Sequence, residues 1–145
     1  MNLSKYFTFD ELTTTVHADL SQRNKIEANS FIPNMIALAE SILDPLREKY
    51  GPITVSSGFR GPSLNLRVGG SGTSQHCKGQ AADLCRPDWN WETLDGVVNW
   101  IAKESGLKFG QAIREKHGDA CWLHISTGEK CQALDFLDGK YTARV

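Results

Sequence analysis

The sequence predicts an α+β fold in which helices pack on one small antiparallel sheet. The 145-residue chain carries helical patterns first and strand patterns later, with one helix between strands. It has no internal repeat and no low-complexity segment. A chain of this length buries roughly 70% of the surface that its unfolded form exposes. We therefore expect a single domain over residues 1–145 that needs no disulfide scaffold.

Helical patterns occupy the first third of the chain. Thr8 followed by Glu11 matches a capping box, in which each side chain binds the other residue's backbone N–H, and this predicts a short helix. In residues 33–50, apolar residues recur at the spacing of one helical face. Pro45 lies inside this segment and cannot donate a backbone hydrogen bond, so it should kink or break the helix near Asp44.

The middle of the chain predicts short strands separated by a long irregular segment. Residues 53–56 are mostly β-branched and bounded by turn residues, which predicts a strand. Residues 61–73 contain five Gly or Pro, so we expect a long surface loop, and such loops are usually functional. Residues 80–85 alternate as a strand does, and residues 91–105 carry the apolar stripe of a helix that stops at Gly106.

The last part of the chain predicts a β-hairpin. Residues 108–115 and 121–127 have strand patterns, and the polar segment 116–120 joins them. His124 lies in the second strand between two apolar residues. Successive side chains of a strand point to opposite faces. We therefore expect one face of this hairpin to join the core and the other to carry a site.

The charge balance excludes some classes of partner. Lys and Arg total 16 and Asp and Glu total 17, whereas nucleic-acid-binding domains concentrate positive charge. The first six residues lack the basic and apolar run of a secretory signal, and no apolar stretch approaches the length of a membrane span. We therefore expect a protein made soluble in the cytoplasm, with no nucleic-acid partner and no membrane insertion. A monomer is expected because no apolar patch is evident.

Two histidines and an aspartate form the most informative pattern. His76 and Asp83 lie in one short segment, and His124 follows later in the chain. A single His or Asp usually has a structural role. Two imidazoles and one carboxylate together, however, are the protein ligands of a catalytic zinc site, which keeps its fourth position for water. We predict one Zn²⁺ ion at His76, Asp83 and His124.

Metal-assisted amide hydrolysis also needs a general base. The candidates near His124 are Glu115, His117, Asp119 and Cys121. We favour Glu115, because it ends the strand before His124 and a carboxylate is the usual partner of zinc in activating water. Strand register decides its direction: a five-residue loop would aim Glu115 away from His124, whereas an even loop or a bulge at Gly118 would bring them to one face.

Three further residues are candidates for substrate contact. Arg60, on the loop after the first strand, could clamp a carboxylate or stabilise an oxyanion, or could pair with an acidic neighbour as a structural residue. Ser74 could hydrogen-bond behind the metal ligands or be an ordinary loop residue. Trp122 could form an aromatic wall for the substrate, although core packing is the default role of a tryptophan.

The cysteines permit two rival interpretations. The chain has Cys77, Cys85, Cys121 and Cys131, with no CxxC pair, and we interpret them as free thiols in a reducing compartment. Cys121 with His124 or His117 could act as a thiol nucleophile, but Cys121 and His124 point to opposite faces of a regular strand. A structural zinc at Cys77 or Cys85 is the other alternative, and it leaves no role for Asp83.

These residues resemble the zinc D-Ala-D-Ala carboxypeptidase family of metallopeptidases, which shares its metal-site scaffold with Hedgehog signalling domains. Residues 57–60 are similar to the family's SG(Y/F)R element, residues 74–83 to its SxHxxGxAxD ligand motif, and residues 122–124 to its WxH element. Three further segments resemble the compact branch often encoded by bacteriophages and prophages. They are residues 7–12, 45–47 and 64–71.

The resemblance implies a Hedgehog/DD-peptidase-like fold and a zinc peptidase that cuts peptidoglycan stem peptides or cross-links. It implies His76, Asp83 and His124 as ligands. Many members have an acidic residue three positions before the last histidine, where this chain has Cys121. The Hedgehog arrangement, with a Glu on the preceding strand, corresponds to Glu115.

The same resemblance leads us to expect a phage or prophage endolysin or a virion-associated murein hydrolase. Such an enzyme would reach the cell wall after lysis-pore opening or from a virion. The alternative, motivated by Cys121, is a non-catalytic zinc-stabilised module that binds the cell wall or forms part of a virion.

Overall fold

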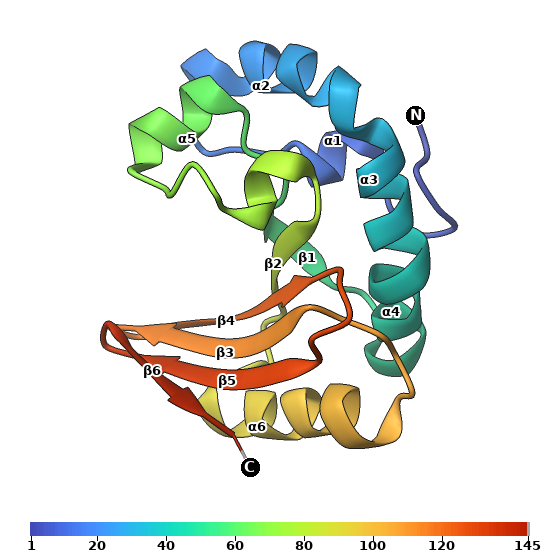
Figure 1. Cartoon of the computed structure of the whole chain (residues 1–145), viewed down its shortest axis with the longest axis vertical. Coiled ribbons are helices and arrows are strands. Elements are labelled where there is room, and N and C mark those ends of the chain that lie inside the picture. The colour runs from blue at the N-terminus through green and yellow to red at the C-terminus, as the bar shows by residue number, and fades with distance from the viewer. Residues whose placement is uncertain (145) are drawn as a thin grey trace.

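A six-stranded sheet lies at the centre of the computed structural model, which describes residues 1–144 (Figure 1). Its strand order is β1-β2-β4-β3-β5-β6. The strands are β1 (Thr54–Ser57), β2 (Ala81–Cys85), β3 (Gln111–His117), β4 (Ala120–Ser126), β5 (Gln132–Leu137) and β6 (Lys140–Ala143). Together with the helices, the sheet confirms the predicted α+β class.

The sheet is mixed, which corrects the expectation of a purely antiparallel one. Neighbouring strands are antiparallel except for β3 and β5, which run parallel. The cause is the connection after β4: the chain crosses the end of β3 and adds β5 on its far side. The patterns in the sequence did not predict β5 or β6.

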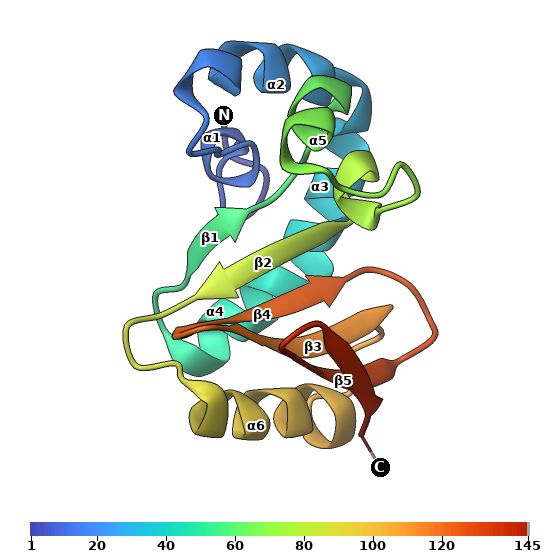
Figure 2. The same cartoon turned by 90° about the vertical axis from the view of Figure 1, so that its left-hand side faces the viewer.

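Helices lie at both ends of the molecule, beyond the sheet. They are α1 (Phe9–Leu12), α2 (Ser21–Ala28), α3 (Ile32–Leu38), α4 (Asp44–Tyr50), α5 (Pro62–Val68) and α6 (Trp91–Asn99). Short 3-10 helices are η1 (Ala18–Leu20), η2 (Asn29–Phe31) and η4 (Gln75–Lys78), and π-helical segments are η3 (Ala39–Leu43) and η5 (Trp100–Glu104). In both views α6 lies along the sheet at one end of the molecule, and α1, α2 and α5 gather at the other (Figures 1 and 2).

The predicted N-terminal helices form with one difference. The Thr8 hydroxyl accepts a hydrogen bond from the backbone of Glu11 at 3.1 Å, and the Glu11 carboxylate accepts one from the backbone of Thr8, which confirms the capping box. The helix predicted over residues 33–50 runs through α3, η3 and α4 without a break at Pro45. Pro45 lies in the first turn of α4, directly after the π-helical segment, where the i→i+5 pattern accommodates the missing N–H.

The long loop predicted over residues 61–73 is wrong in its first half, because residues 62–68 form α5. Pro62 occupies the first turn, where a missing N–H costs nothing, and Gly69 ends the helix with a φ of 71°. Leu64 and Asn65 are buried against the body. The proline and glycine that suggested a loop are therefore the two end signals of a short helix.

The hairpin of β3 and β4 is tighter than the sequence suggested. His117 pairs with Ala120, so only Gly118 and Asp119 form the turn, instead of the expected five-residue segment. Glu115 pairs with Trp122 in this register. Because Trp122 and His124 are two residues apart on one strand, Glu115 and His124 project from the same face of the sheet.

The hydrophobic core covers one face of the sheet, and the residues of the predicted metal site lie on the other face. Leu84, Leu123 and Ile125 of β2 and β4 are fully buried, and they pack with apolar residues of η3, α4 and α6. The residues that alternate with them, Asp83 and His124, lie on the opposite face. No helix within residues 1–144 is long and apolar enough to span a bilayer.

Candidate metal centre

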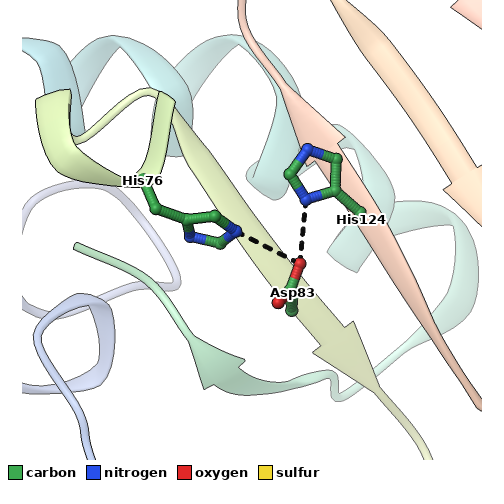
Figure 3. Close-up of side chains that lie close together, drawn as sticks. All are labelled: His76, Asp83 and His124. Carbon is green, nitrogen blue, oxygen red and sulfur yellow. Dashed lines mark hydrogen bonds and ion pairs between the residues drawn. The ribbon is translucent and has the colours of Figure 1, made fainter. Parts of the chain in front are cut away.

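The three predicted ligands come from separate elements and meet at one point (Figure 3). His76 lies in η4, which Ser74 caps: its hydroxyl accepts a hydrogen bond from the backbone N–H of His76 at 3.2 Å. Asp83 and His124 are directly opposite each other on β2 and β4. The antiparallel pairing of β2 and β4 therefore brings His124 beside Asp83, although the two residues are far apart in the sequence.

The ligand atoms lie within 4.8 Å of one another. Nε2 of His76 is 3.4 Å from Oδ1 of Asp83, and Nδ1 of His124 is 2.9 Å from the same oxygen. The His76 residue is 3% exposed, and the side chains of Asp83 and His124 are 18% and 14% exposed. The three ligand atoms are therefore close enough to hold a metal ion, and the side chains of Asp83 and His124 stay partly exposed.

A backbone carbonyl selects the coordinating nitrogen of His76. Nδ1 of His76 lies 2.8 Å from the carbonyl oxygen of Gly58, which can only accept a hydrogen bond. Nδ1 therefore carries the hydrogen, and the lone pair of Nε2 points toward the carboxylate of Asp83. Two acceptors at this distance need a cation or a proton between them, so the donor set fits a zinc ion with nitrogen and carboxylate ligands.

The Asp83 carboxyl is ionised over the ordinary pH range. Burial raises its pKa, but hydrogen bonds and charge interactions with His124 and His76 lower it by more, so the net pKa lies far below the usual value. A buried carboxylate in this state is available as a metal ligand.

Glu115 of β3 lies beside the cluster, with Oε2 3.9 Å from Nδ1 of His124. Burial and the charge of Asp83 raise the pKa of Glu115 to about 7, while His124 and a hydrogen bond with Trp122 lower it in part. A carboxyl group with a pKa near neutrality can both take up and release a proton. This geometry suits the role predicted for Glu115.

The other candidate bases lie away from the cluster. His117 and Asp119 are exposed at the end of the hairpin. Cys121 pairs with Lys116 and packs against the core, so its thiol is on the face opposite His124. All four cysteines are free, and neither Cys77 nor Cys85 belongs to the metal-type cluster found in residues 1–144.

A cavity of about 600 Å³ opens beside the cluster. Ser74, Glu115 and His124 are among its lining residues. Lys130, before β5, and Tyr141, on β6, also line it, and the sequence patterns did not identify them. No motif marks these two residues: Lys130 lies in the connection between β4 and β5, and Tyr141 reaches the cavity through the pairing of β6 with β5 and of β5 with β3.

Arg60 and Trp122 do not line this cavity. Arg60 donates from Nη2 to the Ser74 hydroxyl at 3.2 Å and from its backbone to the His76 carbonyl at 3.0 Å, so it braces the segment that carries His76. Trp122 lies across from Glu115 and is partly buried. The roles predicted for Arg60 and Trp122 in direct substrate contact stay predictions.

Comparison with known proteins gives one result that bears on this site. The model of a family described as Peptidase M15 matches residues 5–126. The matched segment contains the whole cluster of His76, Asp83 and His124, together with Glu115 and the Ser74 cap. Among curated proteins, no match to the chain was found.

Proposed function

Because the chain belongs to the peptidase M15 family, we propose that it is a zinc metallopeptidase that hydrolyses a peptide bond in bacterial peptidoglycan. The observation that carries this proposal is the placement of Glu115 beside His76, Asp83 and His124, at the wall of one cavity. Metal-assisted amide hydrolysis needs three parts. They are a group of residues that can hold a metal ion, a carboxyl group whose pKa is near neutrality, and a cavity that can take a peptide.

The residues divide the work in a simple way. His76 through Nε2, His124 through Nδ1 and Asp83 through its carboxylate would hold the zinc ion. When bound, zinc supplies a Lewis acid for the scissile carbonyl and lowers the pKa of water. Glu115 takes the proton from the attacking water at its carboxylate and delivers it to the departing amine, so that one carboxyl group acts first as base and then as acid.

The substrate bond and the biological setting are the finer parts of the proposal. We propose a D-Ala-D-Ala carboxypeptidase or a murein endopeptidase, acting as a monomeric endolysin or virion-associated hydrolase of a phage or prophage. The support is the resemblance of residues 7–12, 45–47 and 64–71 to the compact phage-type branch. Such an enzyme meets the cell wall after lysis-pore opening or from a virion.

Digestion of isolated peptidoglycan tests this function. The purified protein should release new amino and carboxyl termini, a chelator should abolish the release, and zinc should restore it. Mass spectrometry of the released muropeptides identifies the bond. No new termini at saturating zinc would rule out the peptidase.

The competing proposal is a non-catalytic zinc-stabilised module, motivated by Cys121 at the position where many members have an acid. The structure favours catalysis over this alternative. The thiol of Cys121 faces the core, and Glu115 approaches His124 from the neighbouring strand. Glu115 can therefore serve as the proposed base without any contribution from position 121.

A further inference from the structure

Two parts of the chain build the cavity beside the metal centre. The family match ends at Ser126, which is also the last residue of β4. Ser74, Glu115 and His124 belong to the matched part, whereas Tyr141 belongs to the hairpin of β5 and β6 that follows it. The family match therefore accounts for the cluster and for Glu115, but not for this wall of the cavity.

Strand register places Tyr141 in one row with Glu115. Glu115 of β3 pairs with Phe136 of β5, and Phe136 pairs with Tyr141 of β6. Directly paired residues project from the same face of a sheet. The Tyr141 side chain therefore rises from the face that carries Glu115 and His124, two strand spacings of about 4.8 Å each from β3.

The Tyr141 ring packs against a neighbouring aromatic ring and stays exposed to solvent. The rings of Phe136 and Tyr141 have centroids 4.4 Å apart, so Phe136 supports one side of the phenol. Tyr141 nevertheless stays 58% exposed and lines the cavity with Glu115 and His124. An aromatic ring held on one side and open on the other is suited to contact a ligand.

The charges at this end of the cavity define the ligand chemistry. Partial burial and the nearby charges of Glu115 and Asp83 raise the pKa of the Tyr141 phenol, so it stays a neutral donor. These carboxylates disfavour an anionic ligand group next to the Tyr141 hydroxyl, whereas Lys130, which also lines the cavity, can pair with an anionic group elsewhere in it. A neutral amide carbonyl is the group that fits, since it accepts a hydrogen bond and carries no net charge.

We propose that Tyr141 is a substrate-contacting residue, whose phenol donates a hydrogen bond to a peptide carbonyl oxygen next to the bond that Glu115 helps to cleave. This inference rests on the peptidase function proposed above. It assigns the hairpin of β5 and β6 a role in substrate binding, in which the hairpin supplies a wall that the family match does not include.

The test compares the purified zinc-loaded variants Tyr141→Phe and Tyr141→Ala with Tyr6→Phe in peptidoglycan digestion. Tyr6→Phe is the matched control, because the Tyr6 hydroxyl bonds Glu48 at 2.9 Å and Tyr6 is not a residue of the cavity. Loss of one neutral hydrogen bond predicts a fall in kcat/KM of roughly 3- to 10-fold for Tyr141→Phe. Zinc content and melting temperature should stay at the wild-type values.

A binding measurement separates substrate contact from an indirect effect on turnover. In the Glu115→Gln background with zinc, calorimetry with purified muropeptides should show weaker binding when Tyr141→Phe is added, by a similar factor. Equal activity and equal binding of Tyr141→Phe and Tyr6→Phe would overturn the proposal. A loss confined to Tyr141→Ala would also overturn it, because the ring alone would then matter.

The two proposals fail in different ways. Wild-type protein that releases no termini from peptidoglycan would contradict the peptidase function itself. Active wild-type protein with an unimpaired Tyr141→Phe variant would contradict only the role of Tyr141.

Discussion

The carbonyl of Gly58 fixes which nitrogen of His76 can bind a cation, and Gly58 itself has little freedom. A Cβ at this position would lie 2.3 Å from the carbonyl oxygen of Leu12, to which the backbone N–H of Phe59 donates at 2.7 Å. The N-terminal helix, the end of β1 and the ligand histidine are thus joined through two carbonyl groups. A single backbone carbonyl therefore decides which nitrogen of His76 is free to bind a metal ion.

Removal of the Glu115 carboxylate should abolish turnover and leave the metal centre intact. Glu115→Gln keeps the size of the side chain but cannot move a proton, so we expect a loss of about 10²- to 10⁴-fold in kcat. Zinc content, measured by elemental analysis, should stay near one ion per chain. Glu40→Gln, at an exposed position on η3, is the control and should keep full activity. Wild-type turnover of Glu115→Gln would exclude Glu115 as the base.

Removal of one of the two predicted histidine ligands should instead cause the loss of bound zinc. His76→Ala or His124→Ala leaves two ligands, too few for a stable zinc site, so bound zinc should fall well below one ion per chain after dialysis. His117→Ala, at the exposed end of β3, should retain zinc as the wild type does. Full zinc content in His124→Ala would show that the metal is held elsewhere.

The sequence was sufficient to bring His76, Asp83 and His124 together as candidates, because their residue types and the motif spacing carry the pattern. It was not sufficient to orient Glu115. The direction of that side chain depends on whether the turn at Gly118 has an even number of residues, and the polar segment around it does not define the turn. Tyr141 was out of reach, since only the pairing of β5 with β3 brings it to the cavity.

At the scale of the elements, the link from η4 to β2 has a steric requirement near the site that its glycine meets. Gly79 ends η4 with a φ of 69°, and a Cβ there would lie 2.8 Å from the side chain of Met35. Gly69, at the end of α5, has a φ of 71° but no atom within 4 Å of such a Cβ. The two glycines share a backbone conformation and differ in their surroundings.

This pair gives a controlled test of strain against crowding. Gly69→Ala should cost only backbone strain, about 1 kcal/mol of unfolding free energy. Gly79→Ala should cost more, up to about 3 kcal/mol, because Met35 must also move. Urea denaturation monitored by circular dichroism measures both. Equal losses would show that Met35 yields without cost.

The C-terminal hairpin is tied to the sheet by an aspartate between two arginines. Asp135 of β5 accepts hydrogen bonds from Arg114 at 2.8 Å and from Arg144 at 2.7 Å. Burial raises the pKa of Asp135, but the two guanidinium groups lower it by more, so the net pKa is below the unfolded value. A carboxyl group with this shift stabilises the fold above its unfolded pKa and loses that contribution as the pH falls through its folded pKa.

Asp135→Asn should therefore destabilise the protein in a pH-dependent manner. At neutral pH the variant should unfold at a lower urea concentration than the wild type. The difference should shrink as the pH falls from the unfolded pKa of 3.8 through the lower folded pKa, because the wild-type carboxyl becomes protonated first in the unfolded chain and then in the folded protein. Urea titrations at several pH values check this. A difference that does not change with pH would mean that Asp135 acts through packing and not through its charge.

For the whole molecule, the α+β class followed from the order of the patterns, but the sheet did not. Strands β1 to β4 and the helix around residues 91–105 have clear apolar periodicity, and the structure contains them. Strand β6 is exposed along its whole length, so its residues carry no core pattern to detect. The parallel pairing of β3 and β5 is a long-range contact, which local periodicity cannot specify.

Zinc should stabilise the whole fold, since a preformed cluster exists only in the native state. At a free zinc concentration of 100 times the dissociation constant, the linkage predicts about 2.7 kcal/mol of added stability. The melting temperature of the wild type should rise with zinc and fall with chelator. His76→Ala should show neither change, and an equal zinc response in that variant would place the stabilising ion at another site.

The direct pairing of Asp83 with His124 also has a consequence for the order of folding. Asp83 and His76 are near neighbours in sequence, but His124 joins them only when β4 docks on β2, after a long chain segment has closed. Zinc should therefore lower the unfolding rate far more than it raises the folding rate, because the complete set of ligands forms late in folding. Stopped-flow measurements of the folding and unfolding rates, with and without zinc, would show whether the metal centre forms only in the last step, when β4 docks on β2.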